Sequence, residues 1–477
     1  MKKGWAVAVL AVILAACWQA GWLPQSLLPS GEGAWSERFA TVALLLLGAL
    51  GYRLLFGPPA SRTKKEVVGK GPRPSASKER ERTYATIPPY PNGWYKVANS
   101  TEVKKGQILE VECLSLSLVV FRGEDGKACV ADAHCPHMGA NLAYGGKVVG
   151  NCIECPFHRW QFDTSGKCTK IPYSESIPEI AKLKTYEVVE YYGTYVSFAP
   201  SPCPPFSCPA NLFLPFFRSC QCVSLLLLLF SIYYNITFLL PYIFSICIYY
   251  DAEGRPAPYL PPSIPEMDTF VYRGTYTQDV GMHIQEFAEN SADFQHFDPL
   301  HGNMMIPFTE TQIPGMKIVH KADWIPGKAE EGMSHIAYFK DSAYLTFLGK
   351  EIPRTQANAV ITFVGPAGIV FFTFYTPLGN IVLFQTHLPL KPMLQKVQFV
   401  WYADPKIPRL LVSYVVGNWI AQWRRDIMVW ENKVWAIKPL LVKGDGPVMK
   451  LRRWFQQFYS ENSFKVLEDQ KCSLLDW

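Results

Sequence analysis

The order of apolar and polar positions divides the chain into blocks, and the first block is almost entirely apolar. No charged residue occurs from Gly4 to Gly31, and the run from Phe39 to Phe56 contains only Arg53. Runs of this kind are close to or above the ~20 apolar residues that cross a bilayer as a helix. Basic residues flank the pair on both outer sides, which predicts that both ends face the cytoplasm. Residues 1–57 therefore predict a membrane anchor of one or two spans, with a cleaved signal peptide as the alternative.

A polar linker and a β-rich block follow. Residues 58–85 are rich in Pro, Gly, Ser and charged side chains, which predicts a basic flexible linker. In residues 86–196, short β-branched or aromatic runs alternate with Gly and Asp turns, as in SLSLVVFRGEDGKACVADAHC. This alternation of strand and turn signals predicts a compact β domain.

The composition changes abruptly in residues 197–247, which contain a single charged residue, Arg218. Taken at face value, residues 223–249 are apolar enough for an extra membrane span. A span here would separate the β domain from the rest of the chain, so a second hypothesis is that this insertion is an intron translated in frame. Sequencing the mature transcript across the junction tests the hypothesis, and a message that retains the insertion contradicts it.

Mixed helical and strand character returns in residues 248–465, before a short C-terminal tail at 466–477. Strand-like runs such as GIVFFTFYTPLGNIVLFQTHLPL precede a helix-like run, LVSYVVGNWIAQWRRDIMVWENKVWAI. Neither G-x-G-x-x-G nor the P-loop pattern occurs in the sequence, so no dinucleotide site is visible. Any electrons from NAD(P)H are therefore expected to arrive through a separate reductase.

Composition narrows the function further. The net charge of +6 is spread over the 477 residues without a stripe of Arg and Lys between aromatic residues, which argues against a nucleic-acid partner. The 13 cysteines do not form a disulfide lattice, because five of them fall in or beside the apolar insertion and only Cys135, Cys152 and Cys155 lie close to histidines. We expect a reducing environment for the folded part.

Two loops of the β domain each combine a cysteine with a histidine. The first contains Cys135-x-His137 and the second contains Cys155-x2-His158, with a proline directly after each cysteine. A structural zinc site usually pairs cysteine with cysteine and histidine with histidine. One cysteine and one histidine from each loop instead suit a Rieske [2Fe–2S] cluster, in which thiolates bind one iron and imidazoles bind the other. Cys152 lies near but is interpreted as a buried thiol and not as a ligand.

A second constellation occurs in NSADFQHFDPLHG, residues 290–302, where His296 and His301 are five residues apart. On an ideal helix this spacing splays two side chains by ~140°. Pro299 is expected to break the helix and allow His301 to turn back towards the same ion. Two histidines and one carboxylate with open coordination positions are typical of non-haem Fe(II) oxygenases. Asp293, one turn before His296, is a candidate for fixing the tautomer of an imidazole ligand.

The third iron ligand has to come from elsewhere in the chain. In NWIAQWRRDIMVWENK, apolar residues recur at helical spacing, and Asp426 lies at the edge of this aromatic face. Glu431 is the rival candidate, and a surface acid that pairs with Arg424 or Arg425 is the structural alternative. The remaining histidines of this half are isolated and are interpreted as structural: His283, His320, His335 and His387.

These two motifs together resemble the Rieske non-haem iron oxygenases, over roughly residues 88–465 apart from the insertion. CPHMGANLAYGGKVVGNCIECPFHRWQFD is similar to their cluster loops, and NSADFQHFDPLHG is similar to their iron motif. IPYSESIPEIAKLKTYEV, HIQEFAENSADFQHFDPLHG and RRWFQQFYSENS resemble the animal cholesterol 7-desaturases of the Neverland type. The resemblance implies an α+β chain with a membrane-anchored Rieske [2Fe–2S] β domain and a helix-grip (START-like) non-haem iron catalytic domain.

The resemblance also implies roles for single residues. The cluster ligands would be Cys135, His137, Cys155 and His158, and the ligands of a mononuclear Fe(II) would be His296, His301 and Asp426. Asp293 would carry electrons from a Rieske histidine to the iron site, usually across a subunit boundary in a homotrimer.

The implied activity is the desaturation of cholesterol at C7–C8 to 7-dehydrocholesterol, with O₂ and with NAD(P)H electrons from a separate reductase or ferredoxin. The implied location is the membrane of the endoplasmic reticulum, with the catalytic part facing the cytoplasm. One alternative is a sterol hydroxylase that acts on another steroid, and a second is a Rieske electron carrier without catalysis. A third is a non-enzymatic membrane protein that binds zinc in the β domain.

Overall fold

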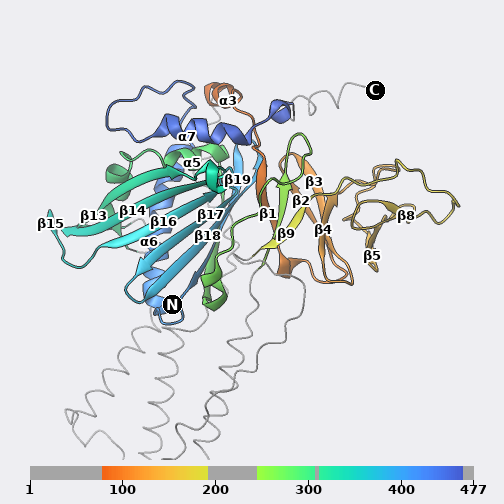
Figure 1. Ribbon diagram of the computed structural model, residues 1–477, viewed down its shortest axis with the longest axis horizontal. Coiled ribbons are helices and arrows are strands. Elements are labelled where there is room, and N and C mark those ends of the chain that lie inside the picture. Colours follow the sequence, from red (N-terminus) through yellow and green to blue (C-terminus); the bar gives the residue numbers. More distant parts are fainter. Residues whose placement is uncertain (1–77, 192–243, 307–310, 466–477) are drawn as a thin grey trace, which may run out of the picture.

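The computed structural model describes residues 78–191, 244–306 and 311–465, which build two adjoining domains (Figure 1). The expected anchor at 1–57, the tail at 466–477 and most of the apolar insertion lie outside these residues. Within the described ranges, no helix is both long and apolar enough to cross a membrane.

The end of the expected linker forms a helix with one buried side. Residues Lys78–Tyr84 form helix α3, in which Arg80 and Tyr84 are buried while most of the other side chains are exposed. The Arg80 guanidinium donates hydrogen bonds to the carbonyl oxygens of Gly281 at 2.7 Å and Trp430 at 3.0 Å. The linker prediction is therefore wrong for these residues, because Arg80 has backbone partners that a composition-based argument does not detect.

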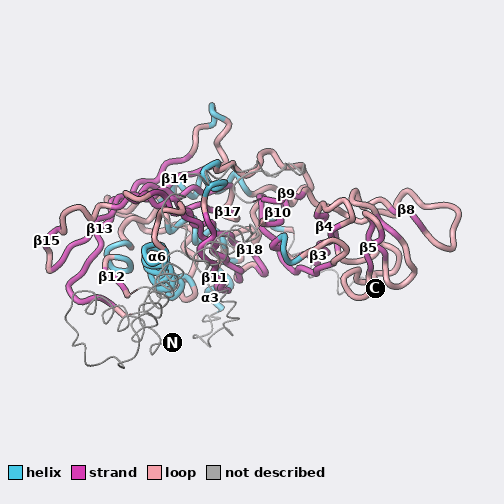
Figure 2. Tube along the Cα trace, turned by 90° about the horizontal axis from the view of Figure 1, so that it is seen from below, coloured by secondary structure: helices cyan, strands magenta, loops and turns pink. Residues whose placement is uncertain are grey.

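The first domain consists of three small antiparallel sheets. Their orders are β1-β10-β9, β2-β3-β4 and β5-β6-β7-β8. Figure 2 shows the β5–β8 part at one end of the molecule, with β13 and β15 at the other. The strands are β1 (Gly93–Asn99), β2 (Ile108–Cys113), β3 (Leu116–Arg122), β4 (Ala128–Asp132), β5 (Lys147–Val149), β6 (Cys152–Glu154), β7 (Gln161–Phe162), β8 (Cys168–Lys170), β9 (Val188–Tyr191) and β10 (Ser245–Tyr250).

The second domain is built on one antiparallel sheet of nine strands. Its order is β11-β19-β18-β17-β16-β14-β13-β12, with β15 paired to β14. The strands are β11 (Val271–Val280), β12 (Asn303–Met305), β13 (Gln312–Pro326), β14 (Ile336–Phe347), β15 (Lys350–Glu351), β16 (Ala357–Val364), β17 (Ile369–Thr376), β18 (Gly379–Lys391) and β19 (Leu394–Ala403). The accompanying helices are α5 (Ile284–Asn290), α6 (Arg409–Trp430) and α7 (Val448–Phe455).

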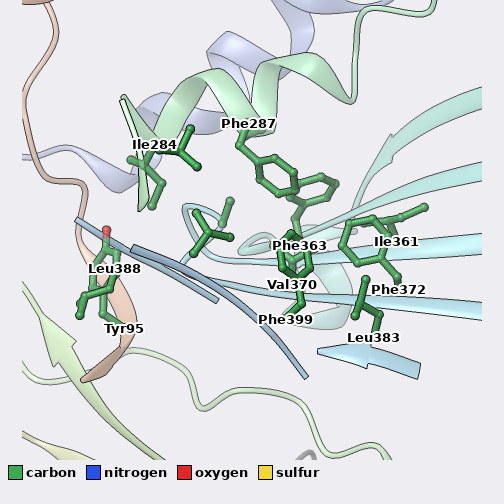
Figure 3. Close-up of a cluster of buried hydrophobic side chains, with 14 of the residues drawn as sticks. Tyr95, Ile284, Phe287, Ile361, Phe363, Val370, Phe372, Leu383, Leu388 and Phe399 are labelled. Carbon is green, nitrogen blue, oxygen red and sulfur yellow. The ribbon is translucent and has the colours of Figure 1, made fainter. Parts of the chain in front are cut away.

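Both faces of this sheet are covered at its centre, which explains the continuous apolar runs in its strands. Successive side chains of a strand point to opposite faces. Phe372 faces α6 and packs against Trp419 at a ring-centroid distance of 4.5 Å, whereas Phe371 belongs to the cluster between this sheet and β1-β10-β9. Figure 3 shows Phe287 of α5 reaching towards Phe363 of β16, with ring centroids 5.7 Å apart.

Strand β10 changes the expected domain boundary. The composition places Ser245–Cys247 in the apolar insertion, but these residues form the first half of β10, and Ile246 and Cys247 are fully buried. The boundary expected between residues 247 and 248 therefore cuts through a strand of the first domain. Strand β10 also pairs antiparallel with β9, with Tyr191 opposite Ser245. Tyr191 and Ser245, which flank the undescribed segment, are therefore neighbours in the sheet.

Candidate active site

His296, His301 and Asp426 meet inside the second domain. One potential ligand atom from each residue lies within 4.8 Å of the others. His301 and Asp426 are each 3% exposed, and His301 Nε2 lies 3.1 Å from Asp426 Oδ1. This oxygen nevertheless has no partner with hydrogen-bond geometry, and His301 Nδ1 has none either among the described residues. Buried polar atoms without partners are costly, so this donor set fits a metal ion with two imidazole ligands and one carboxylate.

A widened helical turn brings the two histidines together. Residues Phe297–His301 form a π-helix, η4, and Pro299 lies inside it, so the expected break at the proline is wrong. In a π-helix the hydrogen bonds connect residues five apart, which is the spacing of His296 and His301. Their ring centroids are 5.0 Å apart with an interplanar angle of 81°. The wider turn thus removes the splay expected on an α-helix.

The tautomer of His296 is set by backbone and not by the Asp293 carboxylate. His296 Nδ1 donates to the Asp293 carbonyl oxygen at 2.5 Å, while the Asp293 carboxylate lies 3.9 Å away and is 44% exposed. The opposite ring nitrogen, Nε2, lies 3.1 Å from the Asn290 amide nitrogen and carries the lone pair. Burial, and then neighbouring His301, lower the pKa of His296 and favour the neutral imidazole that binds metals.

Helix α6 supplies the carboxylate. Asp426 is buried on its inner face, so the alternative of a surface acid is wrong. Arg425 does not pair with it and donates instead to the Leu300 carbonyl oxygen at 2.9 Å, which ties α6 to η4. The rival Glu431 accepts a hydrogen bond from the Gly281 backbone N–H at 2.9 Å, away from the two histidines.

The three residues open onto an apolar cavity between α6 and the sheet. Its volume is about 280 Å³, near the lower end of the ~300–1,000 Å³ usual for small-molecule pockets. Phe339, Phe363 and Phe372 line it from the sheet, and Trp419 lines it from α6. Such a lining favours a hydrophobic ligand.

The two cysteine–histidine loops of the first domain have the same backbone design. The N–H of Cys135 donates to the carbonyl oxygen of Ala140, and the N–H of Cys155 donates to that of Trp160. In each loop the fourth residue after the cysteine, Gly139 or Arg159, has a positive φ and donates its N–H back to the cysteine carbonyl oxygen. The repeat gives both cysteines the same backbone setting, while the histidines follow their cysteines by two residues in the first loop and by three in the second.

The loops place these side chains together at the tip of the first domain. The His137 and His158 ring centroids are 4.6 Å apart, and Trp160 stacks on His137 at 4.5 Å. Burial raises the pKa of the Cys135 thiol to about 11, and His158 Nδ1 is buried without a partner among the described residues. Cys152 is half-exposed and contacts Thr169, which argues against a ligand role but also against a fully buried thiol.

Sequence reasoning missed several residues around the site. Asn290 and Arg425 contact the histidine segment from α5 and α6, and no spacing signal distinguishes them from surface residues. His320, interpreted as an isolated structural residue, lines the cavity and is hydrogen-bonded to Asp341. All seven described cysteines are free, in agreement with the absence of a disulfide lattice.

Comparisons with known proteins agree with this arrangement. Residues 93–187 match the Rieske [2Fe-2S] domain, and residues 248–459 match the 3-ketosteroid 9alpha-hydroxylase C-terminal domain. Among solved structures, a Pseudomonas putida protein, NdmA with caffeine, superposes with a TM-score of 0.50 at 18% identity, covering 78% of this chain and 94% of that one. Together the fold and the site define an oxidoreductase of the Rieske oxygenase class.

Curated relatives narrow this class. "Cholesterol 7-desaturase nvd" of Xenopus laevis is 34% identical, with 91% of this chain and 88% of the relative covered. "Cholesterol 7-desaturase" of Caenorhabditis elegans is 33% identical over 83% of this chain and 84% of the relative. A "Probable 3-ketosteroid-9-alpha-monooxygenase, oxygenase component" of Rhodococcus rhodochrous is 26% identical over 81% of this chain and 87% of the relative. The chain belongs to the cholesterol 7-desaturase family.

Membership confirms the expected cofactors. They are a Rieske [2Fe–2S] cluster and a mononuclear iron, and the NAD(P)H electrons come from a separate reductase. Rieske oxygenases also often form oligomers.

Proposed function

We propose that this enzyme converts cholesterol to 7-dehydrocholesterol by desaturation at C7–C8, with O₂ as the oxidant. The observation that carries the proposal is the buried set of His296, His301 and Asp426 at the wall of an apolar cavity. A sterol is a rigid and almost entirely apolar molecule, so a pocket lined mainly by phenylalanine and aliphatic side chains suits it. The names of the curated relatives support the same substrate and product.

The site residues then have distinct tasks. Cys135 and Cys155 would bind one iron of the cluster as thiolates, and His137 and His158 would bind the other. The second group, His296, His301 and Asp426, would bind the mononuclear iron and leave coordination positions open. This iron, when bound, supplies the activation of O₂ that removes hydrogen from a ring carbon of the sterol.

The protein around the iron site orients and shields the reaction. The Asp293 carbonyl oxygen holds the His296 ring with Nδ1 protonated, so that Nε2 would be the nitrogen that binds the iron. Arg425 fixes the turn that carries His301 through the Leu300 carbonyl oxygen. The aromatic lining excludes water and holds a sterol against the site.

We also propose that the active form is a homotrimer in which Asp293 carries electrons between subunits. Figure 1 shows β5 and β8, at the tip of the first domain, away from α6 and the strands β13, β14 and β16, whose residues line the cavity. Within one chain the cluster loops and the iron site are thus on opposite parts of the molecule. The Asp293 carboxylate is 44% exposed, as a contact point for a neighbouring subunit requires.

Two further features complete the proposal. The antiparallel sheet over one long helix supports a catalytic domain of the helix-grip type. The apolar runs within residues 1–57 and their basic flanks support anchoring in the membrane of the endoplasmic reticulum, with the catalytic part in the cytoplasm.

Sterol profiling of cells fed labelled cholesterol tests this function. The cells would express the full chain or a form in which residues 192–243 are replaced by Asn-Gly, each beside a His296→Ala control. Labelled 7-dehydrocholesterol that depends on His296 supports the proposal. A labelled hydroxysterol in its place shows a hydroxylase. No product from either well-expressed form, or product that survives His296→Ala, contradicts desaturation by this site.

A further inference from the structure

His320 and Asp341 form a hydrogen-bonded pair on the sheet wall of the cavity. His320 lies in β13 and is paired with Ala343 of β14, so that Asp341, two residues earlier, is its diagonal neighbour on the same face. His320 Nδ1 donates to Asp341 Oδ2 at 2.7 Å. Both residues line the cavity that also contains His296 and His301.

The pair is charged or polar, although the sheet wall around it is mainly apolar. Apart from Tyr344 and Asn358, the other described residues of β13, β14, β16 and β17 that line the cavity are alanine, isoleucine, leucine or phenylalanine. The side chains of His320 and Asp341 are only 10% and 13% exposed. A buried polar pair inside an apolar wall is costly to maintain without further hydrogen bonds.

Each member of the pair retains an unused polar atom. His320 Nε2 and Asp341 Oδ1 are buried and have no hydrogen-bond partner among the described residues. Because His320 Nδ1–H is used by Asp341, the neutral ring has its lone pair on Nε2 and accepts a hydrogen bond there. A hydroxyl group is a suitable partner since it can donate to this lone pair, whereas a ketone oxygen only accepts.

The pair lies at a suitable distance from the iron site. The Phe297 ring contacts both histidines, with its centroid 5.1 Å from His320 and 5.4 Å from His301. The rings of His320 and His301 are therefore at most about 10.5 Å apart, which is 5.1 + 5.4 Å. In a sterol, five covalent bonds separate the 3-hydroxyl oxygen from C7, a span of at most ~7.5 Å at ~1.5 Å per bond. A hydrogen bond of ~3 Å at His320 extends this reach to about the upper bound of the ring separation, so one sterol molecule is long enough to reach from His320 to the iron site.

We propose that His320, oriented by Asp341, binds the 3β-hydroxyl group of the sterol and so places C7 near the iron site. The inference rests on the proposed function, because it takes the substrate to be a sterol. The hydroxyl donates to His320 Nε2, and Asp341 acts through the histidine by holding its tautomer. This contact selects sterols with a 3-hydroxyl over those that carry hydrogen or a ketone at C3.

Equilibrium binding to the purified full-length chain tests the anchor directly. The ligands are radiolabelled cholesterol and cholest-5-ene, which has the same hydrocarbon skeleton without the hydroxyl. The wild type is expected to bind cholesterol about 10-fold more tightly or better, since losing the hydroxyl leaves buried polar atoms unpaired. His320→Phe should remove this preference and leave cholest-5-ene affinity within about 2-fold. His335→Phe is the matched control, because His335 stacks on Tyr259 at 4.0 Å and does not line the cavity.

A second variant tests the tautomer. In Asp341→Asn the amide donates to His320 Nδ1, so that Nε2 carries the proton and becomes a donor. Binding of cholest-5-en-3-one relative to cholesterol should then rise about 10-fold over the wild-type ratio. Because this variant keeps the size and shape of the side chain, it remains informative if His320→Phe does not fold.

The results of these experiments distinguish a failure of the proposed contact between His320 and the hydroxyl group from a failure of the proposed desaturation. Equal binding of cholesterol and cholest-5-ene by the wild type overturns the anchor, as does a hydroxyl preference that survives His320→Phe or an unchanged ketone ratio in Asp341→Asn. Product analysis on the same proteins addresses the reaction. If the hydroxyl preference depends on His320 but 7-dehydrocholesterol does not form, the anchor stands and the proposed reaction fails. If 7-dehydrocholesterol forms while His320→Phe keeps the preference, the reaction stands and the anchor fails.

Discussion

The buried ion pair between Glu289 and Arg452 is expected to control the stability of the catalytic domain. Arg452 of α7 donates from Nε to Glu289 Oε2 at 2.6 Å and from Nη2 to Oε1 at 2.9 Å. Its third nitrogen donates to the Ala436 and Ile437 carbonyl oxygens, at 2.7 and 3.1 Å. Glu289 belongs to α5 and directly precedes the segment that carries His296, so this pair ties the iron motif to the C-terminal helix.

Arg452→Met removes the cation and leaves Glu289 buried without a partner. The two side chains are 9% and 11% exposed, so solvent screens their interaction little. Removing one partner of such a pair lowers the free energy of unfolding by about 3–5 kcal/mol. At ~2–4 °C per kcal/mol for a domain of this size, the melting temperature should fall by about 6–20 °C. Arg453→Met is the matched control, because Arg453 directly follows Arg452 in the same helix and its side chain is exposed.

The loss of thermal stability in Arg452→Met should also depend on pH. Burial raises the pKa of Glu289 even with Arg452 present, and removing the cation raises it further. A carboxyl whose folded pKa is raised binds its proton more tightly in the folded state, so stability falls as the pH rises from the unfolded pKa through the folded pKa. The difference in melting temperature between Arg452→Met and the wild type should thus shrink as the pH is lowered from 8 towards the ordinary glutamate pKa of ~4.3.

Thermal unfolding of the purified proteins, followed at one heating rate over this pH range, measures both effects. Arg453→Met is expected to unfold within about 1 °C of the wild type, as surface substitutions usually do. Equal melting temperatures for the Arg452 and Arg453 variants would refute the assigned role of the pair. A deficit that stays constant with pH would refute the electrostatic explanation.

Three other substitutions test the site and the chain connection. Asp426→Asn should lower the affinity for the mononuclear iron by at least 10-fold. The paramagnetic signal of the reduced cluster should remain. If the iron content of this variant equals that of a Glu431→Gln control, Asp426 is not a ligand. Asp293→Asn should leave the iron content unchanged, because the backbone carbonyl oxygen of this residue holds the His296 ring. It should slow product formation at least 10-fold. An unaltered rate of product formation would contradict electron transfer through this carboxylate. Replacing residues 192–243 by Asn-Gly should give a folded protein with an unchanged melting temperature, since β9 and β10 are hairpin neighbours; aggregation of this form would show that the segment is needed.

Short-range spacing was sufficient to predict the cluster loops. Each loop is closed by backbone hydrogen bonds between a cysteine and residues four and five positions later. The order of Cys135, His137, Cys155 and His158 along the chain therefore contains most of the geometry. The same holds for His296 and His301, although the turn between them is a π-helix and not a break at Pro299.

The local motifs and their chemistry could be predicted from the order of the residues, including Asp426 as a carboxylate on an inward helix face. The pairs of distant residues that meet could be found only in the folded chain: Asp426 with His301, His320 with Asp341, and β9 with β10 across the apolar segment. Local motifs are set by hydrogen bonds between residues close in the chain, which leave a readable spacing. Contacts between distant residues depend on strand register and on how α6 packs against the sheet, and a single residue such as His320 carries no sign of either.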